Sequence, residues 1–168
     1  LTFLLGLLCA QSTLAALPFN IQSESALLME VTSGEILVDK NSKKPLPPAS
    51  ITKMMLMLLV MEAVDSGQIK LTDKINASPE ACRMGGSQIW LEPGEEMTVE
   101  DLMKAVSIVS ANDASVALAE YISGSHEEFV KLMNKRGSEL GLENTIYVNA
   151  TGLSPDGGGP GNQTSAYD

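Results

Sequence analysis

The pattern of apolar and polar positions predicts a short β-hairpin near the start of the chain. Two apolar runs, 26–31 and 35–38, flank a Thr-Ser-Gly turn, as two paired strands would. The next segment, 42–50, contains three prolines and cannot form a helix. Because only one hairpin is visible, we expect a mixed α/β (α+β) chain whose sheet is incomplete.

A long apolar helix is predicted after the Pro-rich segment. It opens at Ser50 and runs to about Ser66, where Gly67 ends it. Its interior, 51–64, is apolar nearly all round, so we expect it to be buried on most sides.

Three more helices are predicted downstream, two of them from capping-box spacing. Thr98 stands three residues before Asp101, and Ser125 stands three residues before Glu128. Segment 74–97 looks irregular because it contains Gly-Gly and Pro-Gly turn signals. The remaining predictions are helices over 98–110, 112–123 and 125–140, a short strand or extended segment over 145–153 and a loop over 154–163.

The N-terminal segment, residues 1–16, is typical of a secretory signal peptide. It has no charge, an apolar run and a small-residue end, and it is too short to span a bilayer well. A lipoprotein signal ending at Cys9 is the alternative, although Leu8 stands where a small residue is preferred. Removal of the signal would leave residues 17–168 with Cys82 as the sole cysteine, which we expect to be a small buried hydrophobe. An exported chain without an internal disulfide suits a bacterial envelope protein.

The two ends of the sequence suggest a fragment. No initiator Met or basic segment precedes the apolar run, and the last residues, NQTSAYD, carry no helix cap or tail. We therefore expect residues 17–168 to be the N-terminal part of a larger domain.

Composition excludes several classes of chemistry. A net charge of −10 argues against a nucleic-acid partner, which would favour a basic face. His126, the only histidine, is predicted to be a solvated helix residue, so a Ser-His-Asp triad or a zinc site has little support. No phosphate-binding glycine pattern is present, and no metal or organic cofactor is implied.

The segment PPASITKMM places Lys53 three residues after Ser50, next to an entirely apolar run. Within a helix this spacing puts the two side chains on one face. A serine nucleophile needs a base, and a lysine can be that base if desolvation lowers its pKa. The alternative is that Ser50 caps the helix and Lys53 extends to water.

A second constellation, Ser110-Ala-Asn112, lies at a predicted helix junction. Ser110 could relay a proton between Lys53 and a leaving amine, and Asn112 could hydrogen-bond a substrate amide. The alternative is that Ser110 ends one helix and Asn112 caps the next.

Ser-x-x-Lys followed by Ser-x-Asn, with GGSQIWLEPGE between them, resembles the low-molecular-mass D-alanyl-D-alanine carboxypeptidases. The resemblance covers about 25–168 and is strongest to the membrane-peripheral penicillin-binding type of Gram-positive bacteria. It implies a β-lactamase/transpeptidase-like fold with an antiparallel sheet beside a helical subdomain.

The resemblance implies that Ser50 is the acylated nucleophile, Lys53 its general base, and Ser110 and Asn112 the opposite wall of the cleft. It places 84–90 near the rim of the active site. The implied activity is removal of the terminal D-alanine from a peptidoglycan pentapeptide ending in D-Ala-D-Ala, with β-lactams as covalent inhibitors. The implied location is the bacterial envelope after export, peripheral to the membrane if a C-terminal anchor exists.

One family feature is missing, namely the Lys-Thr-Gly or Lys-Ser-Gly motif. Ala150-Thr151-Gly152 has no lysine and is interpreted as a turn. In the family this motif binds the substrate carboxylate and adds a charge that lowers the pKa of the base. We therefore expect the chain alone to be inactive and poorly stable. Two alternatives stay open, a β-lactamase and a non-catalytic relative that binds cell-wall peptides.

Overall fold

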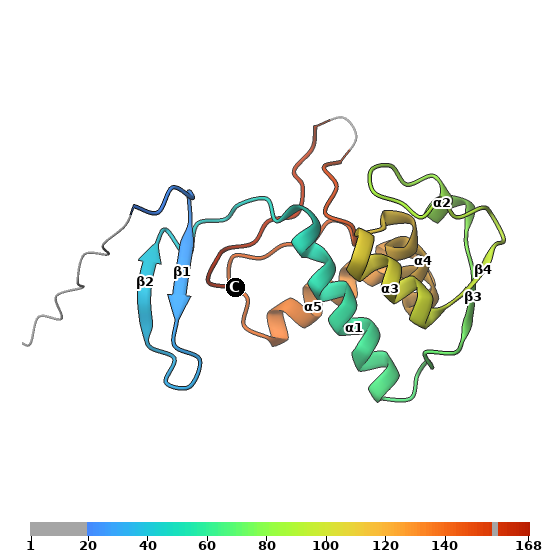
Figure 1. Cartoon of the computed structure of the whole chain (residues 1–168), viewed down its shortest axis with the longest axis horizontal. Helices are drawn as coiled ribbons and strands as arrows, with labels where there is room; N and C mark the ends of the chain where they lie inside the picture. Colours follow the sequence, from blue (N-terminus) through green and yellow to red (C-terminus); the bar gives the residue numbers. More distant parts are fainter. Residues whose placement is uncertain (1–19, 156–157) are drawn as a thin grey trace, which may run out of the picture. The chain divides into compact units, whose positions relative to one another are not determined.

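The computed structural model describes residues 20–155 and 158–168 (Figure 1). The predicted signal peptide lies outside this range. The chain divides into two compact units, of which the first ends at Ser42 and the second covers Lys43–Asp168. Every candidate site residue belongs to the second unit.

The first unit contains the predicted hairpin. Strand β1 (Ala26–Met29) pairs with β2 (Ile36–Lys40) in antiparallel register, with Ala26 opposite Lys40. The second strand begins one residue later and ends two residues later than the sequence pattern indicates.

The second unit is built around one central, almost fully buried helix. Residues 112–119 of helix α4 are all buried, and α4 contacts four other helices. Its first turns are rich in alanine, a small residue that lets neighbouring helices approach closely. The helices are α1 (Lys53–Asp65), α2 (Pro79–Cys82), α3 (Val99–Val109), α4 (Asn112–Ser123) and α5 (His126–Glu139), and a short 3₁₀ helix, η1 (Ala49–Thr52), precedes α1.

Both predicted capping boxes begin a helix as expected. The Thr98 hydroxyl accepts a hydrogen bond from the Asp101 amide at 3.1 Å, which fixes the start of α3. The Ser125 hydroxyl accepts one from the Glu128 amide at 3.1 Å at the start of α5. Cys82 is half-buried and packs against the core, in keeping with its prediction as a small hydrophobe.

One secondary-structure prediction was wrong. Segment 74–97 is not wholly irregular, because β3 (Lys74–Asn76) and β4 (Glu96–Thr98) form an antiparallel ladder and α2 lies between them. Of the two alternatives for 145–153, the regular strand does not form, and the segment pairs through an isolated bridge between Ile146 and Gln163. Strands of three residues are too short for alternation to show, and the later segment is held by side chains instead.

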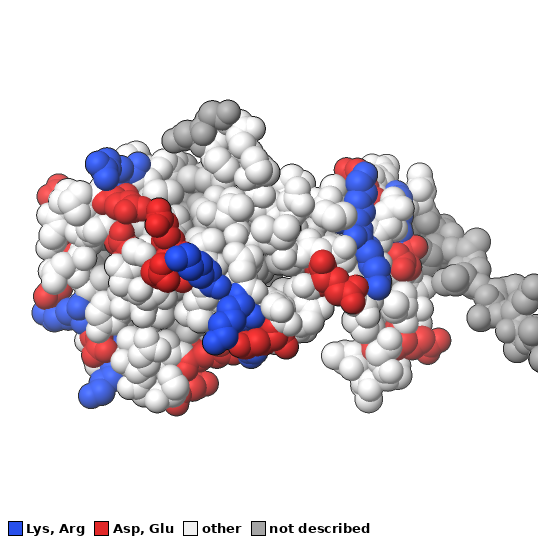
Figure 2. Space-filling model, turned by 180° about the vertical axis from the view of Figure 1, so that it is seen from behind, with Lys and Arg blue, Asp and Glu red and all other residues white. Residues whose placement is uncertain are grey.

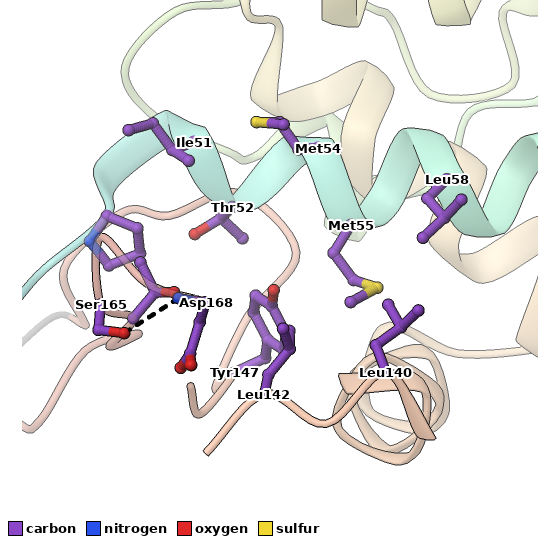
Figure 3. A pocket seen from close by; sticks show the side chains of 12 residues that line it. Ile51, Thr52, Met54, Met55, Leu58, Leu140, Leu142, Tyr147, Ser165 and Asp168 are labelled. Atoms are coloured by element: carbon purple, nitrogen blue, oxygen red, sulfur yellow. Dashed lines mark hydrogen bonds between the residues drawn. The ribbon is translucent and has the colours of Figure 1, made fainter. Parts of the chain in front are cut away.

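Helix α1 is buried on one side only, which corrects the prediction of burial on most sides. Its inner side carries Leu56 and Val60, which are fully buried. On its outer side Ile51, just before the helix, and Met54 are 63% and 66% exposed. Figure 3 shows Thr52, Met55 and Leu58 facing a largely apolar pocket of about 430 Å³, bounded below by Tyr147 and the end of α5.

Charges over the second unit are mixed rather than segregated. On the face shown in Figure 2, acidic and basic side chains lie next to one another. The Arg136 guanidinium, for example, contacts the Glu62 carboxylate at 2.8 Å and so ties α5 to α1.

Candidate active site

Ser50 and Lys53 lie together at the junction of η1 and α1. The Lys53 amine donates a hydrogen bond to the Ser50 hydroxyl at 3.2 Å. Ser50 belongs to the 3₁₀ turn, and α1 begins at Lys53, so Ser50 does not open the α-helix as predicted. It also caps neither helix, which removes the simpler structural explanation for this serine.

The amine of Lys53 is buried while the serine beside it is exposed. Lys53 is only 3% exposed, so its side chain does not extend to water. Desolvation lowers the pKa of this amine from 10.5 to about 8, because burial disfavours the charged form. The amine is therefore closer to giving up its proton at neutral pH than an ordinary lysine.

A backbone carbonyl from a distant part of the sequence completes the surroundings of Lys53. The carbonyl of Thr151 accepts a second hydrogen bond from the amine at 2.7 Å. Thr151 lies in a tight turn folded around the side-chain oxygen of Asn149, which accepts hydrogen bonds from the amides of Thr151 and Gly152 at 3.1 and 2.7 Å. The turn thus holds its carbonyl on the lysine.

Gly152 brings this turn against Ala49, the residue before Ser50. Its φ is +82°, and a Cβ atom at this position would lie 1.9 Å from the carbonyl oxygen of Ala49. No side chain fits there, so glycine permits the approach. Ala49 itself has a φ of 47°, a strained value for a residue other than glycine.

Asn162 ties the same turn to η1, the short helix that contains Ser50. It is 4% exposed. Its amide nitrogen donates to the Thr52 hydroxyl and to the Asn149 carbonyl, both at 2.9 Å. Residues from three separate segments therefore fix the position of Lys53 relative to Ser50.

Ser110 and Asn112 both carry a buried polar atom that has no partner among the described residues. The atoms are the Ser110 hydroxyl and the side-chain oxygen of Asn112. Ser110 ends α3 in a left-handed conformation, with φ 61°, and Asn112 is the first residue of α4. Buried polar groups are normally paired, so these two atoms each have a hydrogen-bonding position to offer to a ligand or a water molecule.

Segment 83–91 packs over the start of α4. The Asn112 amide group donates to the Gly85 carbonyl at 2.7 Å, and the buried Asp113 carboxylate accepts from the Leu91 amide at 3.1 Å. Segment 84–90 thus lies against Asn112. Between this segment and the turn at Thr151 lies a pocket of about 550 Å³, which is lined by Arg83–Gly86, Asn149, Thr151 and Leu153–Pro155.

Sequence reasoning missed the residues that support Lys53. Asn149 and Gly152 belong to an Asn-Ala-Thr-Gly pattern, which is a turn signal. The sequence pattern predicts the turn but not its contact with Lys53. The prediction of a solvated His126 was wrong, because its side chain is 15% exposed and its Nε2 accepts a hydrogen bond from the Ala150 amide at 3.0 Å. Across the described ranges, no three His, Cys, Asp or Glu side chains are grouped as a metal ion would require.

Comparison with known proteins gives consistent matches. The family model described as D-alanyl-D-alanine carboxypeptidase matches residues 11–168. The chain is 56% identical over 147 residues to D-alanyl-D-alanine carboxypeptidase DacF of Bacillus subtilis, which covers 88% of this chain and 37% of the relative. It is 38% identical over 144 residues to DacC of Escherichia coli, covering 82% and 36%.

Solved structures of carboxypeptidases and penicillin-binding proteins also match the chain, which confirms the predicted transpeptidase-like mixed fold. The carboxypeptidase DacD from Francisella tularensis matches with a TM-score of 0.83 and 32% identity over 94% of this chain and 38% of its own. Penicillin-binding protein D2 from Listeria monocytogenes, solved in an ampicillin-bound form, matches with a TM-score of 0.77 and 28% identity over 90% and 59%. The chain spans less than two fifths of the length of the first curated relatives. The family match covers nearly the whole chain, and the chain belongs to the D-alanyl-D-alanine carboxypeptidases, the S11 peptidase family.

Proposed function

We propose that the protein is a serine-type D-alanyl-D-alanine carboxypeptidase that works through an acyl-enzyme on Ser50. The observation that carries the proposal is the pairing of an exposed serine with a buried amine 3.2 Å away, whose pKa is lowered to about 8. Such a pairing activates a hydroxyl without a histidine. The relatives are named for the same activity.

In the proposed reaction, neutral Lys53 removes the proton of the Ser50 hydroxyl as its oxygen attacks the carbonyl carbon of the penultimate D-alanine. The C–N bond to the terminal D-alanine then breaks, and the leaving amine takes a proton. Water attacks the resulting ester, which releases the shortened peptide and restores the serine. Backbone N–H groups of the 3₁₀ turn at Ser50 can stabilise the oxyanion of each tetrahedral intermediate.

Ser110 and Asn112 are assigned the opposite wall of the cleft. The unpaired Ser110 hydroxyl is suited to passing the proton from Lys53 to the leaving amine. The amide nitrogen of Asn112 is held by Gly85, which leaves its free oxygen to accept a hydrogen bond from a substrate N–H. Each step uses only side chains, backbone groups and water.

Replacing Ser110 by alanine should slow acylation roughly 10²-fold, the scale of a positioned proton transfer. Thermal stability should be nearly unchanged, because the hydroxyl has no hydrogen bond to lose within the described part of the chain. Acylation kinetics and a melting curve measure the two effects. An unchanged rate would reduce Ser110 to the residue that ends α3.

We propose that the protein acts in the bacterial envelope, where its substrate is found. The substrate is a peptidoglycan pentapeptide ending in D-Ala-D-Ala, and β-lactams would acylate the same serine because they resemble that dipeptide. Export depends on residues 1–16 acting as a signal peptide, and a peripheral membrane position depends on a C-terminal anchor. No helix in the described ranges is long and apolar enough to cross a membrane.

Release of D-alanine from a synthetic pentapeptide tests the function directly. The full-length gene product should release D-alanine from a peptide ending in D-Ala-D-Ala and should leave one ending in D-Ala-L-Ala intact. Rapid hydrolysis of benzylpenicillin without release of D-alanine would instead identify a β-lactamase. Peptide binding without turnover would identify a non-catalytic relative.

A further inference from the structure

We propose that His126 is a positioning residue for the general base, and that it releases the base when its imidazole is protonated. The inference rests on the proposed role of Lys53. His126 is the first residue of α5, and its Nε2 accepts a hydrogen bond from the Ala150 amide at 3.0 Å. The next residue is Thr151, whose carbonyl accepts the 2.7 Å hydrogen bond from Lys53. The histidine contact and the lysine contact are therefore made by adjacent residues of the turn.

The contact requires a neutral imidazole with its proton on Nδ1. A ring nitrogen accepts a hydrogen bond only when it carries no proton, and in the charged form both nitrogens are donors. Protonation of Nε2 would point one N–H group at another. The Ala150 amide, which belongs to a fully buried residue, would then lose its acceptor.

Among the described residues, no other side chain accepts a hydrogen bond from the Ala150 amide. The side-chain oxygen of Asn149 already accepts from the amides of Thr151 and Gly152. The side-chain oxygen of Asn162 already accepts from the amides of Val148 and Asn149. The Asn149 and Asn162 bonds hold the two flanks of the turn, and His126 holds its middle. Loss of the middle contact would let the Thr151 carbonyl move away from the lysine.

The charged groups around the imidazole come from three helices. Glu80 of α2 has a carboxylate oxygen 3.8 Å from Nδ1, and Glu120 of α4 and Glu127 of α5 act from farther away. Burial lowers the pKa of His126, and these carboxylates oppose it without cancelling it, so the pKa stays below its ordinary value of 6.5. The imidazole is then neutral at pH 7, as the contact requires.

The direction of the pH effect follows from this lowered pKa. The unfolded chain binds the histidine proton near pH 6.5, whereas the folded chain binds it only at lower pH. Stability therefore falls as the pH drops from about 6.5 towards the folded pKa. Below that pKa the turn is released, and acylation should fall more steeply than the titration of Lys53 alone requires.

The test is the pH profile of acylation of the full-length protein by benzylpenicillin, from about pH 4.5 to 8.5. As the pH falls, the rate of the unsubstituted protein should drop about tenfold per pH unit between pH 8 and the His126 pKa, because Lys53 is titrated. Around and below the His126 pKa it should drop more steeply, by about a further tenfold in total, as the contact is lost. His126→Gln keeps an acceptor that does not titrate, so it should retain the rate at pH 7 within about threefold and lose the steep acid limb. His126→Leu should be about tenfold slower at pH 7, the scale of one lost hydrogen bond.

Two further variants separate the contact from general effects. Glu80→Gln removes the nearest carboxylate and should move the steep limb to lower pH. Lys135→Gln changes an exposed charge on the same helix and should leave the profile unchanged. A steep acid limb that persists in His126→Gln would overturn the proposal.

Nitrogen NMR of histidine-labelled protein gives a readout independent of activity. At pH 7 the His126 signal, identified by its absence in His126→Gln, should show a protonated Nδ1 and an unprotonated Nε2. A protonated Nε2 would overturn the contact. If benzylpenicillin acylates nothing at any pH, the proposed function fails, whereas the NMR result still decides whether His126 holds the turn.

Discussion

Replacement of Ser50 by alanine is expected to abolish covalent labelling by benzylpenicillin and to lower D-alanine release by roughly 10⁴-fold or more. The exposed hydroxyl is the one serine oxygen that contacts the Lys53 amine in the described part of the chain. Without it no ester can form, whatever else remains in the cleft. Intact-mass spectrometry and a D-alanine assay measure the two losses.

The matched control is Ser138→Ala, an exposed serine on α5 outside the site. It should label and turn over like the unsubstituted protein. Ser50→Ala should melt close to the unsubstituted protein, because the side chain buries little surface. Persistent labelling of the folded Ser50→Ala variant would refute the assignment of the nucleophile.

Replacement of Lys53 by arginine should also abolish acylation, because arginine cannot give up its proton at any working pH. Lys53→Met should abolish it as well, but for the opposite reason, since methionine never carries a proton. The pKa of Lys53 is about 8 in the folded chain against an ordinary 10.5, so burial of the charged amine lowers the stability of the fold at pH 7. This loss of stability is relieved only as the pH rises above 8. Methionine removes this loss, although it leaves the Thr151 carbonyl without its donor.

The pH dependence of acylation provides a second readout of the same base. The fraction of neutral amine, and with it the rate, should rise about tenfold per unit towards a plateau near pH 8. The Lys-Thr-Gly or Lys-Ser-Gly motif that the resemblance implies would lower the pKa of Lys53 further by adding a positive charge. Near-normal acylation by Lys53→Arg, or a rate that does not change between pH 6.5 and 8, would remove Lys53 from the role of base.

The features predicted correctly from the sequence are local ones. Ser50 and Lys53 are three residues apart, so their contact follows from helical geometry alone. The starts of α3 and α5 were predicted because Thr98 and Ser125 each act on an amide three residues away. The hairpin follows in the same way from two apolar runs beside a turn.

The features that the sequence could not reveal depend on distant contacts. Lys53 and Thr151 are 98 positions apart, and the acceptor is a backbone carbonyl, which every residue possesses. His126 looked solvated because its sequence neighbours are polar, yet the turn at Ala150 folds onto it. Residues of α1 such as Met54 were predicted to be buried because they are apolar, but no described element covers them.

The measurement that tests the central claim most directly is intact-mass spectrometry of the full-length protein after incubation with benzylpenicillin, followed by peptide mapping. We expect a lasting adduct of one penicilloyl group per chain, attached to Ser50. An adduct on another residue, or unchanged penicillin beside a folded, unmodified protein, would contradict the proposal that the buried amine of Lys53 activates Ser50.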